Sequence, residues 1–115
     1  RYLMAMHGDR VVGVFPLARV DSRLSGTLLV SVPYGVYGGT LADDDEAHRA
    51  LLDRAMALAD GEGAQWLDIR SIRARWPELP TQDRYVTFRK PLPDDPNRVI
   101  GELPRKARAA LLRKP

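Results

Sequence analysis

Residues 34–39 hold the side chains best suited to contact a ligand, two tyrosines among three glycines. Tyr34 and Tyr37 could stack on a substrate or form hydrogen bonds with it, and Gly38 and Gly39 would let the backbone approach it closely. The segment follows an apolar run and precedes a helical pattern, where α/β folds place ligands. We therefore predict substrate contacts at these four residues. The alternative is that the glycines only shape a strand-to-helix turn and the tyrosines cap the core.

A phosphate site is not expected at the helix that follows this segment. Backbone N–H groups at a helix N-terminus attract anions, but this helix begins with four acidic residues, 43–46, which would repel a pyrophosphate. The chain also contains neither a G-x-G-x-x-G motif nor a P-loop. Binding of a nucleotide or coenzyme A diphosphate there is disfavoured, and we predict no cofactor.

The remaining titratable residues do not identify a catalytic group. Asp68, Glu78 and Asp83 show no pairing in the sequence, and most Asp and Glu side chains are solvated. Only Asp68 stays a candidate, because it lies on the polar face of an expected strand. We expect His7 to be a strand residue and His48 an exposed helix residue, neither placed for a triad. The chain has no cysteine, and its two histidines are far apart, so we expect no metal site.

The basic charge is concentrated at the C-terminal end. Residues 1–97 carry 12 basic and 14 acidic side chains, whereas residues 98–115 carry six and one. Within the expected last helix, Arg105, Lys106 and Arg108 could bind phosphate groups. The alternative is an ordinary solvated helix surface.

The periodicity predicts the order ββ-β-α-β-β-α in a mixed α/β (α+β) sheet. Alternating and apolar runs predict strands at 2–7, 10–17, 27–32, 65–70 and 85–90, and the first two are joined by Gly8-Asp9 in a tight hairpin. Helices are expected from 43 to about 60, opened by a capping box of Asp43 and Glu46, and from 101 to 114. Pro16 should lie at an edge or a bulge. The first helix should cross over between parallel strands and cover one face.

Length and composition fit one globular domain spanning residues 1–115, with 44% hydrophobic and 29% charged residues. No window approaches the roughly 20 apolar residues that span a bilayer, and no signal peptide pattern opens the chain. We therefore expect a cytoplasmic protein. Both ends look interrupted, which suggests a piece of something longer.

Several phrases, in this order and spacing, resemble FemAB-like proteins of the kind associated with bacterial exosortase (PEP-CTERM) systems. They are VFPL at 14–17, SVPYGVYGG at 31–39, LDIR at 67–70, YVTFRK at 85–90 and LPRKAR at 103–108. The resemblance runs over nearly the whole chain.

The resemblance implies a longer protein with two domains of the GCN5-related acetyltransferase (GNAT) fold, of which this chain is most of the first. FemAB relatives transfer an amino acid from aminoacyl-tRNA to a peptidoglycan precursor. An aminoacyl-tRNA or a nucleotide-linked precursor is thus the implied partner, together with a second GNAT-like domain. The coenzyme A loop of this fold, Gln/Arg-x-x-Gly-x-Gly/Ala, is replaced at 37–43 by YGGTLAD. The alternatives are a non-catalytic binding or scaffolding domain and an acetyl-CoA-dependent N-acyltransferase.

Overall fold

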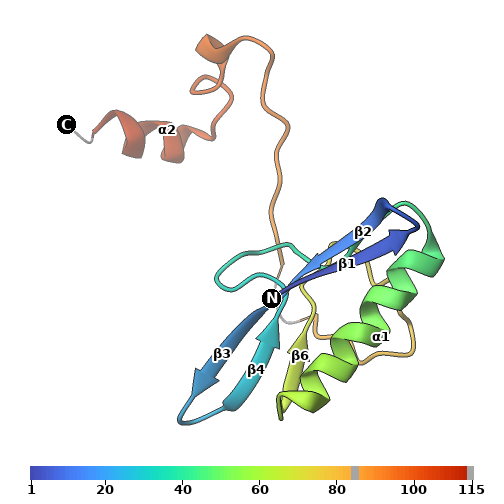
Figure 1. Ribbon diagram of the computed structural model, residues 1–115. Coiled ribbons are helices and arrows are strands. Elements are labelled where there is room, and N and C mark those ends of the chain that lie inside the picture. The colour runs from blue at the N-terminus through green and yellow to red at the C-terminus, as the bar shows by residue number, and fades with distance from the viewer. Residues whose placement is uncertain (84–85, 114–115) are drawn as a thin grey trace. The chain divides into compact units, whose positions relative to one another are not determined.

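The computed structural model describes residues 1–83 and 86–113, and the chain divides into two compact units, Arg1–Pro80 and Thr81–Pro115. The first unit contains the strands β1–β6 and the long helix α1 (Figure 1). The described part of the second unit contains the 3-10 helix η1 (Pro96–Arg98) and the helix α2 (Arg105–Leu112). The mixed α/β class expected from the sequence is confirmed.

The predicted N-terminal hairpin is confirmed. Strands β1 (Tyr2–His7) and β2 (Arg10–Pro16) pair antiparallel around a turn in which Gly8 has a φ of +59°. This left-handed conformation is the one that glycine adopts without steric cost. The short strand β5 (Leu41–Ala42) pairs with the other edge of β2 and completes the first sheet, in the order β1-β2-β5.

Pro16 ends β2 at a position where its missing N–H costs nothing. The Leu17 N–H donates to the Arg1 carbonyl oxygen at 2.9 Å, so these two residues form a hydrogen-bonded pair. The neighbouring pair, Tyr2 and Pro16, is therefore of the non-hydrogen-bonded kind. On the other side of β2, β5 pairs only with Gly13 and Val14. The chain turns after Pro16 and enters a second sheet.

The second sheet is mixed, as predicted, and has the order β3-β4-β6. Strand β3 (Ala18–Ser22) is antiparallel to β4 (Gly26–Val30), and β6 (Trp66–Asp68) is parallel to β4. The sequence did not predict a separate β3. The strands expected at 27–32 and 65–70 are shorter than expected.

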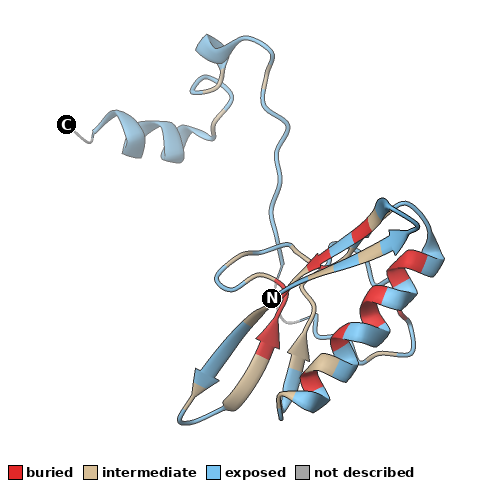
Figure 2. Ribbon diagram, viewed as in Figure 1, coloured by how far each residue is buried: buried red, intermediate tan, exposed pale blue. Residues whose placement is uncertain are grey.

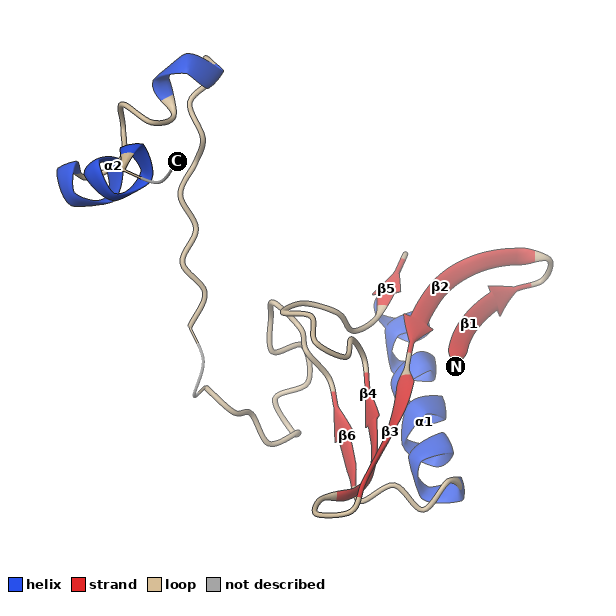
Figure 3. Cartoon of the chain, turned by 90° about the vertical axis from the view of Figure 1, so that its left-hand side faces the viewer, coloured by secondary structure: helices blue, strands red, loops and turns tan. Residues whose placement is uncertain are grey.

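Helix α1 (Asp45–Gly61) lies along one side of the strands (Figure 3) and connects β4 to the parallel strand β6. Its N-cap is Asp44, whose carboxylate accepts a hydrogen bond from the Ala47 N–H at 2.8 Å. The expected capping box of Asp43 and Glu46 is therefore wrong by one residue. At the other end Gly63 has a φ of +63°, and the Ala64 N–H reaches back to the Ala59 carbonyl oxygen, which closes the helix as a Schellman motif.

The core lies between α1 and the strands. Phe15, Leu17, Leu51 and Ala55 form one buried cluster, and the buried residues of α1 fall along one side of the helix (Figure 2). The helix contacts β1, β2, β5 and β6, so a single helical face covers parts of both sheets.

In the second unit the strand expected at 85–90 is wrong for residues 86–90, which form no strand; Tyr85 lies outside the described residues. The last helix is shorter than the expected 101–114, with Pro104 at its N-cap, and Lys114 is not described. No residue of α2 is buried. No helix in the described part of the chain is long and apolar enough to cross a bilayer.

We expect Leu51→Ala to lower the free energy of unfolding of the first unit by about 3 kcal/mol, because it removes buried methyl groups and leaves a cavity. Met56→Ala, on the exposed side of the same helix, should change it by less than about 1 kcal/mol. Urea unfolding followed by circular dichroism measures both. Equal effects of the two substitutions would contradict this account of the core.

Candidate functional site

The Tyr–Gly segment forms a loop at the carboxyl ends of two parallel strands, β4 and β6. After β4, the Ser31 N–H donates to the Asp68 carbonyl oxygen at 2.9 Å, and farther along the Gly38 N–H donates to the Arg70 carbonyl oxygen. Residues 32–37 thus form a loop, and the residues at its two ends are hydrogen-bonded to Asp68 and Arg70 at the end of β6. Ligands of α/β folds bind at this edge.

The side chain of Arg70 holds the loop in place. Its Nη1 donates to the Gly35 carbonyl oxygen at 2.9 Å, and its Nε donates to the Asp68 carboxylate at 3.0 Å. Its backbone N–H donates to the buried Ser31 hydroxyl at 2.9 Å. Asp68, the one carboxylate retained from the sequence, is therefore engaged in an ion pair. Arg70 was missed, although its spacing of two residues from Asp68 places both side chains on one face of the extended chain.

Packing accounts for two of the loop glycines. A Cβ at either Gly35 or Gly38 would overlap the side chain of Val32. Gly39 has a φ of +104°, a conformation that other residues rarely adopt. Gly38 and Gly39 thus have a structural role, whatever they contact in a complex.

Tyr34 lies at the exposed part of the loop and has an unfavourable backbone conformation. Its φ is +61°, and it is the single non-glycine residue of the described chain with a positive φ. Its side chain is fully exposed, which rules out the reading that Tyr34 caps the core. Tyr37 is also exposed, at 37%. Strained, exposed residues of this kind cluster at ligand sites.

His48 attaches the end of the loop to α1, and the expectation of an exposed helix residue is wrong. It is 7% exposed, and its Nδ1 lies 2.7 Å from the Thr40 hydroxyl, directly after Gly39. Burial lowers the pKa of His48, and the nearby Arg75 guanidinium lowers it further. The spacing in the sequence could have indicated this burial, because His48 begins the helical stripe that Leu51 and Leu52 continue.

The three predicted phosphate contacts belong to the second compact unit, whereas the loop belongs to the first. Arg105, Lys106 and Arg108 are exposed on α2, and Arg105 and Arg108 are three residues apart, so they share a face. The Arg108 guanidinium donates to the Leu103 carbonyl oxygen at 3.3 Å. Among the described residues, no group of three His, Asp or Glu side chains is placed to hold a metal ion.

We expect Tyr34→Gly to raise the free energy of unfolding by about 0.5–1 kcal/mol. A left-handed conformation costs an L-residue about 1–2 kcal/mol, and the greater freedom of glycine in the unfolded chain offsets part of the gain. Tyr37→Gly, at a residue without positive φ, should lower it. Thermal and urea unfolding test the pair, and a comparable loss of stability in both variants would argue against strain at Tyr34.

We expect the free energy of unfolding to fall as the pH drops below about 6.5. The pKa of His48 is lower in the fold than its usual value of 6.5, so the unfolded chain takes up the proton first on acidification. His48→Gln should remove this slope, and His7→Gln, at an exposed strand end, should keep it. Denaturant unfolding at a series of pH values measures the slope. If it survived in His48→Gln, another group would be responsible.

The carboxylates act in a separate, more acidic range. Hydrogen bonds from Arg1 and Arg19 lower the pKa of Glu62 below its usual 4.5, and hydrogen bonds from Arg19 and Thr27 lower the pKa of Asp21 below 3.8. Their contribution is present above these usual values and is lost as the pH falls through the lowered ones. The His48 step can therefore be measured on its own.

Comparison of the chain with protein-family models, with curated proteins and with solved structures found no match. Its function is therefore inferred from the geometry of its own residues and from the resemblance of the sequence phrases given above.

Proposed function

We propose that this chain is part of a FemAB-like aminoacyl or acyl transferase with a GNAT-like fold, acting on an amine of a cell-envelope or peptidoglycan-type precursor. The strand–helix–strand unit of β4, α1 and β6 supports this, because its parallel strands place a tyrosine- and glycine-containing loop at their carboxyl ends. The order of the sequence phrases that resemble FemAB-like proteins is the second support.

The observation that carries the proposal is the combination of strain and anchoring in the loop. Tyr34 is exposed in a left-handed conformation, and Arg70 fixes the loop next to it through the Gly35 carbonyl oxygen. A loop whose backbone is already anchored loses little backbone conformational entropy when it binds a ligand. Tyr34 and Tyr37, with Gly38 and Gly39, would line part of the acceptor pocket.

The reaction needs no covalent enzyme intermediate. The acceptor amine attacks the carbonyl carbon of the aminoacyl ester, a C–N bond forms, the ester C–O bond breaks, and the leaving ribose oxygen takes up the proton that the amine loses. Positioning and a donor to the developing oxyanion can supply the catalysis. A tyrosine hydroxyl is such a donor. Arg105, Lys106 and Arg108 would contact the phosphates of the donor or the precursor.

Coenzyme A is a poor fit to this loop. Its pyrophosphate would need free backbone N–H groups, but the Gly38 N–H is already bonded to the Arg70 carbonyl oxygen. The sequence of residues 37–43 departs from the coenzyme A motif at the same place.

A non-catalytic binding domain is the second candidate function, and the Asp68–Arg70 pair favours it. A general base has to be free to take a proton. The carboxylate retained from the sequence is instead bonded to a guanidinium at 3.0 Å. A scaffold would keep the loop and its ligand without performing the transfer.

Titration of residues 1–115 with uncharged tRNA, a nucleotide-linked muropeptide and acetyl-CoA tests the proposal. We expect binding of the tRNA or the muropeptide that weakens with salt, and none of acetyl-CoA. Tyr34→Phe with Tyr37→Phe, and separately Arg105, Lys106 and Arg108 to Ala, should each weaken it about tenfold. Tyr2→Phe, at an exposed tyrosine outside the loop, is the matched control.

The outcomes separate the candidates. Tight binding of acetyl-CoA with no binding of the other two ligands would support an acetyl-CoA-dependent acyltransferase instead. Binding by the chain without any transfer of a labelled aminoacyl group by the full-length protein would favour the scaffold. Wild-type affinity in both sets of variants would show that the site residues are wrong.

A further inference from the structure

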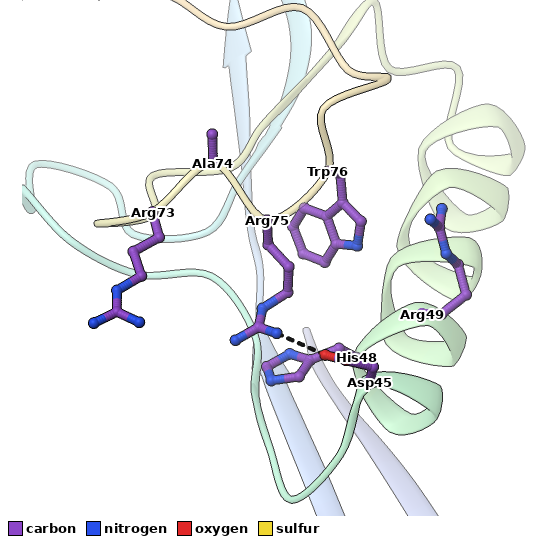
Figure 4. A pocket seen from close by; sticks show the side chains of 7 residues that line it. All are labelled: Asp45, His48, Arg49, Arg73, Ala74, Arg75 and Trp76. Atoms are coloured by element: carbon purple, nitrogen blue, oxygen red, sulfur yellow. Dashed lines mark hydrogen bonds and ion pairs between the residues drawn. The ribbon is translucent and has the colours of Figure 1, made fainter.

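A polar hollow lies beside the first turn of α1, and none of the predicted substrate or phosphate contacts lines it. Its volume is about 430 Å³, within the range of small-molecule sites. Figure 4 shows its lining, with side chains from α1 on one side and from the segment after β6 on the other. The lining residues are Asp45, His48, Arg49, Arg73, Ala74, Arg75 and Trp76.

The lining carries three guanidinium groups and a single carboxylate. Arg49 is paired with Glu78 at 2.7 Å, and Arg75 is paired with Asp45 at 2.8 Å, the contact drawn in Figure 4. The Arg73 guanidinium has no ion pair or hydrogen bond with any other described residue. The hollow therefore has an excess of positive charge and one cation without a partner.

An anionic ligand can replace Asp45 as the partner of Arg75. The Asp45 side chain is 93% exposed, and exposed pairs of this kind contribute about 0–1 kcal/mol. When Asp45 swings into water it loses little, because water solvates its carboxylate well. Arg75 would then bind the same anion as Arg73, which lies two residues before it in the chain.

The floor of the hollow is ordered before any ligand arrives. Trp76 is 8% exposed, and His48 is held by its hydrogen bond with Thr40. Guanidinium groups match the geometry of phosphate oxygens and bind them through two hydrogen bonds at once. Two arginines two residues apart suit a dianionic phosphate better than a single carboxylate.

The acids at the start of α1 do not prevent this. Asp43 is paired with Arg10 at 2.6 Å, Asp44 caps the Ala47 N–H, and Asp45 is paired with Arg75. Before the anion binds, two of the four acids are thus paired with guanidinium groups and a third caps the helix, which reduces the repulsion expected from the sequence; the Asp45 pair is the one that the anion replaces.

We infer that this hollow binds the phosphate group of a phosphate ester between Arg73 and Arg75. The binding site is in the first compact unit and does not depend on the transfer reaction proposed above.

Trp76 provides the measurement. The chain has two tryptophans, so Trp66→Phe, at an exposed strand position, leaves Trp76 as the sole indole reporter. In this background the fluorescence should change on titration with inorganic phosphate and with uridine diphosphate at low salt. Tighter binding of the diphosphate would show that the rest of the ligand also contacts the hollow, and equal binding would show a site for phosphate alone.

Arg73→Gln should weaken the binding of both ligands about tenfold, which is the effect of losing one charge-assisted hydrogen bond. Its side chain makes no contact that folding depends on, so this variant should fold. Asp45→Asn should tighten binding several-fold, because Arg75 is released and a negative charge is removed. Arg23→Gln, at an exposed arginine in the β3–β4 turn, is the matched control and should leave affinity unchanged.

Three results would overturn the inference. They are wild-type affinity in Arg73→Gln, an equal loss of affinity in Arg23→Gln, and an affinity in Asp45→Asn no higher than in the wild type. The first would place the anion elsewhere, the second would show non-specific attraction to basic charge, and the third would show that Arg75 takes no part.

Discussion

The packing of one face of α1 against the strands is the constraint on which the first unit depends. Leu51 and Ala55 are almost completely buried in one cluster, which Phe15 and Leu17 complete from the strand side. Because α1 starts after β4 and delivers the chain to β6, burying this face forces the two strands to run parallel. Their carboxyl ends then meet at one edge. The pairing of β4 with β6, supported by this packing, brings residues 31–39 next to residues 68–70.

The loop is a consequence of that meeting. Once the two strand ends are adjacent, Ser31 and Gly38 can pair with the chain around Asp68 and Arg70, and the Arg70 guanidinium can reach the Gly35 carbonyl oxygen. These polar bonds lie at the edge of a core that apolar packing has already fixed. A loop held in this way can keep an exposed aromatic residue in a strained conformation, because the surrounding bonds determine its backbone.

Local patterns in the sequence were sufficient for the elements that local interactions define. The first hairpin follows from Gly8, and α1 follows from its apolar stripe and the glycines after it. Strand β3 and the two-residue β5 were missed because they are defined by long-range pairing rather than by their own composition. The strand expected at 86–90 has suitable residues, but none of the described residues pairs with it as a strand neighbour. His48 is buried on the core-facing side of α1 and bonded to Thr40, eight residues away, which its residue type alone did not reveal.

The electrostatics of the helix start show why counting charges along the chain misleads. The acids at 43–46 suggest a site that repels anions, but guanidinium groups from β2 and from the segment after β6 approach two of them within hydrogen-bond distance. At such distances the local pairs dominate the field, and more distant formal charges are screened. What matters to a ligand is then the cation left without a partner. In the hollow that cation is Arg73, beside an arginine whose own partner is exposed to solvent. Affinity for phosphate can therefore arise in a unit whose arginines do not outnumber its acidic residues.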